Sequence, residues 1–221
     1  MAVRGRPRAF DRNAALERAM RVFWAKGYEA TQLADLTAAM GINPPSFYAA
    51  FESKEAIFRE AVDLYLATDG AASMRALADT ASTRDAIGAM LLASIDIALA
   101  NPAKGGCMVS LGLINCQEQN EGVRALMRGL RKTTEDLIYQ RLEHGRADGE
   151  LSPSADIGRI SRFYAAMLQA LSLQAQDGAS QKDLAGIAEA SLAALDSVLA
   201  RPEQRISGPA ARRRKDPGAG L

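Results

Sequence analysis

Arg-Gly-Arg-Pro-Arg, at residues 4 to 8, is the first group of residues in this sequence whose types and spacing could do chemistry. Guanidinium groups suit DNA phosphates, and Arg on an extended chain also suits the narrow minor groove of A·T-rich DNA, where the negative potential is deepest. We therefore predict that Arg4, Arg6 and Arg8 bind DNA. The residues leave open whether this arm reads A·T content or only holds phosphates.

The two cysteines, Cys107 and Cys116, are the second such group. Cys107 follows two glycines and could start a helix, where the helix dipole would make a thiol more reactive. One hypothesis is that Cys107 senses an oxidant or an electrophile. The other, which we favour at both positions, is a small buried apolar side chain.

Neither group has the composition of an enzyme site or a metal site. The chain has no Gly-rich phosphate loop and no nucleophile elbow, and its single histidine, His144, stands near the end of a predicted helix. Two cysteines with one histidine are too few ligands of the right spacing for zinc. We predict no catalysis, no cofactor and no metal.

Three short helices are predicted in the first fifty residues, where they would position a DNA-binding surface. The first covers about residues 13–26, because apolar residues recur there at helical spacing until a glycine follows. The second begins after an N-cap at Thr31 and closes at Gly41. The third is capped by Asn43 and covers residues 44–51, with Pro44 at the first position, where its missing N–H costs nothing. Two short helices joined by a tight turn indicate a helix-turn-helix, whose second helix lies in the DNA major groove.

An ordered set of residues gives this segment a resemblance to a known family. The set is Phe23, Gly27-Tyr28, Ala30-Thr31, Gly41, Tyr48, Phe51 and Lys54. Through it, residues 10–58 resemble the tetracycline-repressor (TetR) family of bacterial regulators. The chain departs from the family pattern at Leu36-Thr37, where Ile-Ala is usual, and at Pro44-Pro45, where Lys, Gly or Thr is frequent.

The resemblance implies two different roles for the residues that face DNA. Thr31, Tyr48 and Lys54 match positions that contact phosphates, whereas Pro44, Pro45, Ser46 and Ala49 match the groove-facing side. Phe47 and Phe51 are expected in the core. Two prolines and an alanine offer only apolar contacts to bases, so part of the specificity must come from elsewhere.

The rest of the chain predicts an all-α protein with a second, larger helical domain. Of the 221 residues, 48% are hydrophobic and only 5% aromatic, and β-branched runs are scarce. Further helices are predicted at about residues 54–78, 84–100, 123–146, 155–176 and 181–199. We divide the chain into a basic arm (1–12), a helix-turn-helix domain (13–58), a helical ligand-binding and dimerisation domain (59–200) and a disordered basic tail (201–221).

The last two predicted helices carry wide apolar faces, and family members usually dimerise through them. We therefore expect a homodimer interface made by Phe163, Met167, Leu184, Leu192 and Leu195. The alternative is that both helices belong to the core of one subunit.

Charge and motifs together favour a cytoplasmic transcriptional regulator. Residues 1–60 and 201–221 are net basic and residues 61–200 net acidic, and no secretory signal or membrane span is recognisable. The main hypothesis is a homodimeric repressor on a palindromic double-stranded operator, released by a small-molecule effector that is an electrophile or oxidant if Cys107 is the sensor. A thiol redox-sensing protein and an architectural DNA-binding protein are the alternatives.

Overall fold

The computed structural model describes residues 10–100, 106–111 and 117–199. Within these residues the regular structure is helical, which confirms the predicted all-α fold. The α-helices are α1 (Arg12–Ala30), α2 (Leu33–Met40), α3 (Pro44–Phe51), α4 (Lys54–Ala67), α5 (Ala72–Asp79), α6 (Thr83–Ala100), α7 (Met108–Leu111), α8 (Glu121–Ala147), α9 (Ile157–Gln176) and α10 (Gln181–Asp196), with short 3-10 turns at Asp69–Ala71 and Glu118–Asn120.

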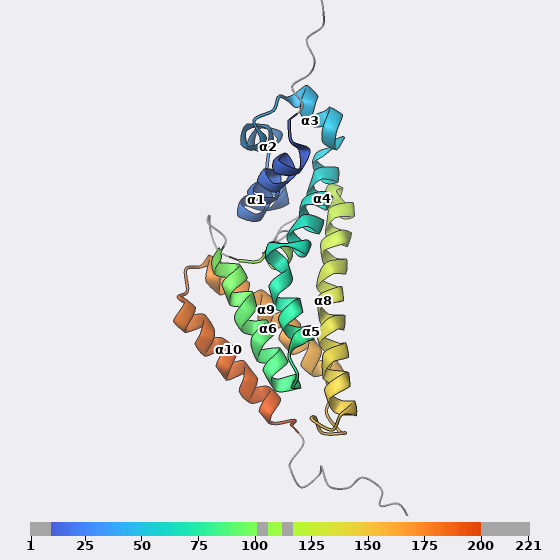
Figure 1. Ribbon diagram of the computed structural model, residues 1–221, viewed down its shortest axis with the longest axis vertical. Helices are drawn as coiled ribbons and strands as arrows, with labels where there is room; N and C mark the ends of the chain where they lie inside the picture. The colour runs from blue at the N-terminus through green and yellow to red at the C-terminus, as the bar shows by residue number, and fades with distance from the viewer. Residues whose placement is uncertain (1–9, 101–105, 112–116, 200–221) are drawn as a thin grey trace, which may run out of the picture.

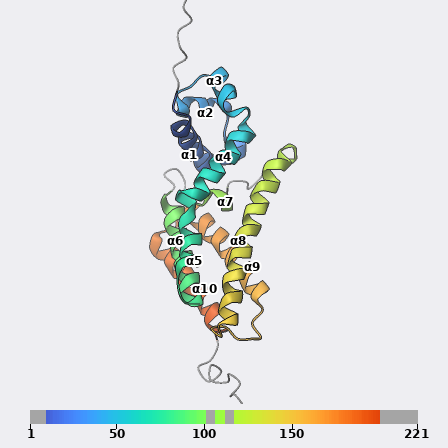
Figure 2. The same cartoon turned by 45° about the vertical axis from the view of Figure 1, so that its right-hand side comes forward.

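The helices form a small group joined to a larger bundle. Helices α1, α2 and α3 lie together at one end, and α4 leads from them toward α5, α6, α8, α9 and α10 (Figure 1). The view turned by 45° shows the same division, with α8 running along the bundle (Figure 2). The N-terminal end of α8 lies against α4, where Arg59 Nη2 donates to the Gly122 carbonyl at 3.1 Å.

An aromatic core holds α1 against α4. The ring of Phe58 meets Phe23 and Tyr28 edge-on, each at a centroid distance of 5.0 Å. Gly27 has a φ of 74°, a conformation that favours glycine, and α1 kinks there. The predicted end of the helix at Gly27 is therefore wrong, because α1 continues past the kink to Ala30. All three rings are at most 5% exposed, and removing such a ring costs about 3–5 kcal/mol of stability.

A second core joins α6, α8, α9 and α10 in the larger bundle. Tyr164 on α9 is fully buried, and its hydroxyl donates to the Ser191 carbonyl on α10 at 3.0 Å. This contact fixes α9 against α10. No helix among the described residues is long and apolar enough to span a membrane.

The prediction of one continuous helix over residues 54–78 is wrong. The chain leaves helical geometry at Thr68, with φ −121° and ψ −100°, and resumes in α5. The Thr68 hydroxyl donates to the Leu64 carbonyl at 2.7 Å, which caps α4. A Cβ on Gly70 would collide with the ring of Tyr65, so the glycine lets the returning chain pack on that ring. Helical periodicity on both sides of the break hides it in the sequence.

Candidate nucleic-acid interface and cavity

Local capping interactions position α2 and α3. Gln32, not Thr31, is the N-cap of α2, and the Asp35 carboxylate accepts from the Gln32 backbone N–H at 2.9 Å. The prediction of Thr31 as N-cap is therefore wrong by one residue. Gly41 closes α2 with φ 68°, and the Asn43 side chain caps α3 by accepting from Ser46 N at 2.9 Å, both as predicted.

Helix α3 has one buried face and one exposed face. Phe47 and Phe51 are at most 1% exposed and belong to the aromatic core, as expected. The residues predicted to face the groove include Pro44, Pro45 and Ala49, which are exposed, whereas Ser46 is half-buried. The outward face of α3 is therefore mainly apolar, and α3 stands at the end of the molecule (Figure 1).

Tyr48 and Lys54 lie beside this exposed face. Tyr48 is 53% exposed, and its ring meets Phe47 edge-on at 5.4 Å. Lys54 is the first residue of α4, which Ser53 caps, and its ammonium lies 4.3 Å from the centroid of the Tyr28 ring. A cation over an aromatic ring at a helix N-terminus is favourably placed for a phosphate.

The Thr31 side chain lies elsewhere than the resemblance implies. It is 1% exposed, and its hydroxyl donates to the Gly27 carbonyl at 2.6 Å. The hydroxyl therefore joins α1 to the start of α2 from inside the domain.

Arg12 is a residue at this interface that the sequence analysis left in the basic arm. It is the first residue of α1, and its guanidinium lies 4.5 Å from the centroid of the Phe51 ring. The same side chain pairs with Glu60 at 2.8 Å and donates to the Ala50 carbonyl at 3.3 Å. Arg12 thus holds α1, α3 and α4 together. The Asp11 side chain caps α1 by accepting from the backbone N–H groups of Asn13 and Ala14, and an Asp at this position is the sequence signal that could have assigned Arg12 to the helix.

The arm residues Arg4, Arg6 and Arg8 lie outside the described residues, as do Cys116 and the basic tail. Their predicted roles stay predictions.

A cavity of about 140 Å³ lies in the larger bundle, between α4, α5, α6, α7, α8 and α9. Most of its wall is aliphatic, and its polar lining includes Tyr65, Cys107, Ser110, Arg131, Thr134 and Gln169. A cavity of this volume accepts a molecule about the size of benzene.

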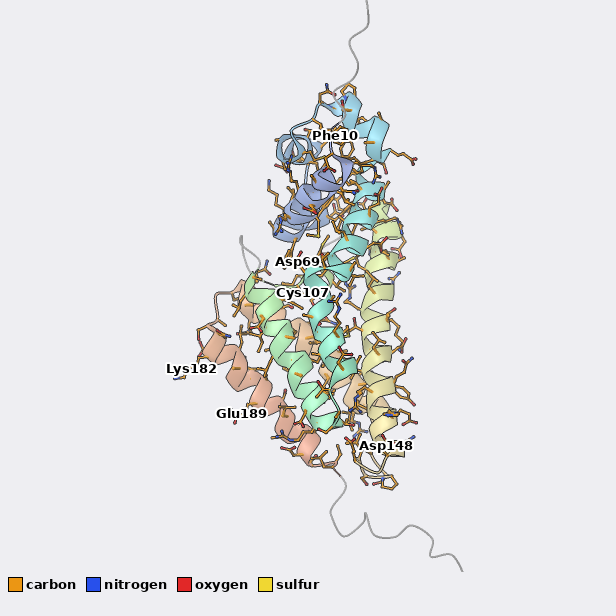
Figure 3. All side chains as sticks on the ribbon, in the orientation of Figure 1. Phe10, Asp69, Cys107, Asp148, Lys182 and Glu189 are labelled. Atoms are coloured by element: carbon orange, nitrogen blue, oxygen red, sulfur yellow. The ribbon has the colours of Figure 1, made fainter. Side chains whose placement is uncertain are left out.

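Tyr65 and Cys107 connect this cavity to the DNA-binding helices. The Tyr65 hydroxyl donates to Cys107 Sγ at 3.2 Å, and burial raises the Tyr65 pKa well above its usual range, so the phenol remains a donor. The Trp24 ring meets the Tyr65 ring edge-on at 5.0 Å, and Trp24 Nε1 donates to the Gly106 carbonyl at 2.8 Å. Figure 3 shows Cys107 at the level where the helices α1 to α4 meet the bundle.

Cys107 directly precedes α7, and its carbonyl accepts from Leu111 N at 3.0 Å. The prediction that a helix starts there is confirmed. Because α7 has only four residues, its dipole gives little reason for a reactive thiol. The stronger observation is that Cys107 is half-buried and lines the cavity.

The residues predicted for a dimer interface divide into two groups. Phe163 is 38% exposed, and Met167 and Leu192 are half-buried. Leu184 and Leu195 are 0% exposed and pack inside the second core of a single subunit, so their assignment to an interface is a wrong prediction. Apolar spacing alone could not separate the two sides of α10.

Leu173 is an exposed apolar residue on α9 that the sequence analysis did not select. It is 43% exposed and lies ten residues after Phe163 on the same helix. The charged residues Lys182 and Glu189 extend outward from α10 (Figure 3).

Among residues 10–100, 106–111 and 117–199, no group of three or more His, Cys, Asp or Glu side chains could hold a metal ion.

Two family models match this chain. The model described as bacterial regulatory proteins, tetR family, matches residues 15–61, and the model described as tetracyclin repressor-like, C-terminal domain, matches residues 83–190. Among curated relatives, the HTH-type transcriptional repressor ComR of Escherichia coli K12 is 32% identical over 86% of this chain and 90% of its own length. The repressor BdcR of the same organism is 27% identical over 89% and 95%, respectively.

A solved structure with the same fold contains DNA. A cysteine-substituted form of the TetR family transcriptional regulator CifR, complexed with 26-bp double-strand operator DNA, is 40% identical to this chain with a TM-score of 0.81. That match covers 86% of this chain and 99% of the CifR chain. The reduced form of E. coli NemR has a TM-score of 0.68 at 22% identity, which is a likeness of fold alone.

Proposed function

Because this chain belongs to the TetR family of bacterial regulatory proteins, we propose that it is a transcriptional repressor that binds operator DNA as a dimer and is released by a small molecule. The observation that carries the proposal is α3, which has an exposed face at the end of the molecule and a helix-turn-helix geometry. The relatives named as repressors, and the solved CifR complex with operator DNA, support it.

In this proposal α3 lies in the major groove, and the residues at its edges hold the backbone. Tyr48 and Lys54 contact phosphates, which position the protein without reading bases. Pro44, Pro45 and Ala49 make apolar contacts, for instance with thymine methyl groups, and Ser46 offers a hydroxyl. Thr31 acts indirectly, because its buried hydroxyl fixes the start of α2. Arg4, Arg6 and Arg8 supply further DNA contacts.

The division of the chain follows from these roles. Residues 13–58 form the DNA-binding domain, and residues 59–200 form the domain that dimerises and binds the effector. The dimer uses the exposed side of α9 and α10 that includes Phe163, Met167 and Leu192. A two-fold axis would place two copies of α3 on half-sites one or more helical turns apart.

Release requires an effector that binds more tightly to a conformation that cannot bind operator DNA than to the DNA-binding conformation. The cavity is suited to this task, because Tyr65 belongs to α4 and lines it. Helix α4 starts at Lys54, directly after α3, so a ligand that displaces Tyr65 would also shift the DNA-binding helices relative to the bundle.

A reactive effector is the second candidate, and the position of Cys107 in the cavity wall favours it. In that case the thiolate of Cys107 adds to an electrophilic carbon, a C–S bond forms, and the electrophile takes up a proton. The adduct would replace the contact between Cys107 Sγ and the Tyr65 hydroxyl. A Cys107→Ser variant should then bind operator normally but no longer respond to the electrophile. A variant that responds like the parent protein returns Cys107 to a packing role.

The experiment that tests the proposed function is selection of bound fragments from a genomic DNA pool by the full-length protein. We expect a short palindromic site with half-sites about one or two helical turns apart. Lys54→Ala should recover the same site with weaker retention, which makes it the control for phosphate contacts. Capture without sequence preference would contradict the proposal and would support the architectural alternative.

A further inference from the structure

We propose that the cavity binds a small carboxylate-bearing molecule whose carboxylate pairs with Arg131. This inference rests on the proposed function, since it names the chemical class of the effector. A guanidinium presents paired N–H donors that match the two oxygens of a carboxylate.

The charge of the cavity favours an anion. Among the described residues that line it, Arg131 is the charged one, and the others are apolar, hydroxyl, thiol or amide side chains. The nearby Asp69 is exposed and does not line the cavity. The two internal segments outside the described residues, 101–105 and 112–116, contain no Asp or Glu. A cationic ligand would therefore meet a positive charge and no compensating carboxylate.

Arg131 differs from its nearest basic neighbours on α8, which pair with carboxylates. Arg124 and Arg128 pair with Glu121, at 3.4 and 2.7 Å, and Lys132 pairs with Asp136 at 2.6 Å. Within the described part of the chain, no carboxylate lies within ion-pair distance of Arg131. Burial lowers the Arg131 pKa, and the positive charge of Arg128 lowers it further. The half-buried guanidinium therefore carries its positive charge at a desolvation cost, which a bound anion would offset.

The described hydrogen bond of Arg131 leaves most of its donors for a ligand. Arg131 Nη1 donates to the Val109 carbonyl at 3.3 Å, which uses one of five N–H groups. Val109 belongs to α7, and it follows closely after Cys107, which contacts Tyr65, and Gly106, which contacts Trp24. A carboxylate that draws Arg131 toward itself would therefore change the contact between α8 and α7, and α7 in turn contacts α1 and α4.

The size and lining of the cavity define the rest of the ligand. At about 140 Å³, it has room for one aromatic ring or a short aliphatic chain. Leu130, Leu137 and Leu168 give an apolar wall, and Thr134 adds a hydroxyl. The ligand class is thus a small aromatic or short-chain monocarboxylic acid.

Titration calorimetry on the full-length protein without DNA tests this inference. The probes are benzoate, phenylacetate and hexanoate, each compared with its uncharged amide. A charge-assisted pair with Arg131 should make each carboxylate that fits bind about ten-fold more tightly than its amide. Arg131→Met should bring this ratio to about one, and Arg131→Lys should retain part of it. Arg128→Met is the matched control, because Arg128 is on the same helix but is exposed and paired with Glu121.

Three results would overturn the inference: no binding of any of the three carboxylates, equal binding of carboxylate and amide, or an unchanged ratio in Arg131→Met. If Arg131→Met does not fold, as judged by circular dichroism, the parent protein and Arg131→Lys still decide between these outcomes. Operator binding is measured separately. A protein that binds benzoate through Arg131 but fails to bind an operator would contradict the proposed function and leave the cavity assignment intact.

Discussion

Replacing Phe163 with alanine should separate the proposed dimer into monomers without unfolding the subunit. Phe163 is 38% exposed, which for an aromatic side chain of about 200 Å² leaves roughly 80 Å² to be covered by a partner. At about 25 cal/mol per Å², this area contributes about 2 kcal/mol per subunit. A two-fold interface uses the side chain twice, so the loss is about 4 kcal/mol, or roughly a thousand-fold in the dimer dissociation constant.

Sedimentation equilibrium over a wide range of protein concentration measures this constant. Tyr139→Ala is the matched control, because Tyr139 is an aromatic residue with 41% exposure on α8, away from the proposed interface. Thermal unfolding followed by circular dichroism checks that both variants fold. A dissociation constant for Phe163→Ala within about three-fold of the parent value would refute this interface.

The same measurement on Leu195→Ala distinguishes the interface from the core. Leu195 is 0% exposed in a single subunit, so its truncation should lower the free energy of unfolding by about 2–5 kcal/mol. Association of the folded subunits should change little. A charged residue at Leu195 tests folding, and it is no test of dimerisation.

Three further predictions concern the DNA-binding end. Asn43→Ala should lower the free energy of unfolding by about 1 kcal/mol, because α3 loses its N-cap. Asn43→Ser should lower it by much less, since serine can also cap a helix. Urea unfolding measures both values, and equal losses would mean that the cap is not the cause. Lys54→Ala and Tyr48→Phe should weaken operator binding without changing the preferred sequence. Lys54→Ala should also reduce the slope of the logarithm of the binding constant against the logarithm of salt concentration by about one. A changed base preference at normal affinity would disprove the phosphate role. In gel-shift titrations, deleting residues 2–8 should cost more affinity on operators with A·T-rich flanks than on operators with G·C-rich flanks. An equal loss on both would mean that the arm only contacts phosphates.

The Arg131 proposal and the Cys107 hypothesis concern the same cavity but predict different ligands. A reversible carboxylate needs Arg131 and leaves the Cys107 thiol unmodified, whereas an electrophile needs the thiol. Mass spectrometry of the protein after exposure to each compound therefore separates the two, since only the electrophile adds mass. Both would act close to Tyr65, which lies at the α4 side of the cavity.

Local interactions made several helix boundaries of this protein predictable from its sequence. The cap at Asn43 and the turn glycine Gly41 act within a few residues, so the start of α3 and the end of α2 were predicted correctly. The outer helices α6, α8, α9 and α10 agree with the predicted ranges within three residues at each end. Their apolar periodicity is strong enough to define them without tertiary contacts.

Tertiary structure decided which side of each helix meets which neighbour. Leu195 and Phe163 are both apolar, but only the packing of α10 on α6 and α9 buries Leu195 within one subunit. Thr31 has a side chain suited to a phosphate, but its hydroxyl is buried and donates to the Gly27 carbonyl. Arg131 and Cys107 are 24 residues apart in sequence, and helix packing brings both to one cavity. Caps and periodicity are local and are therefore encoded in short stretches of sequence, whereas burial, ion pairing and cavities depend on distant segments that only the folded chain brings together.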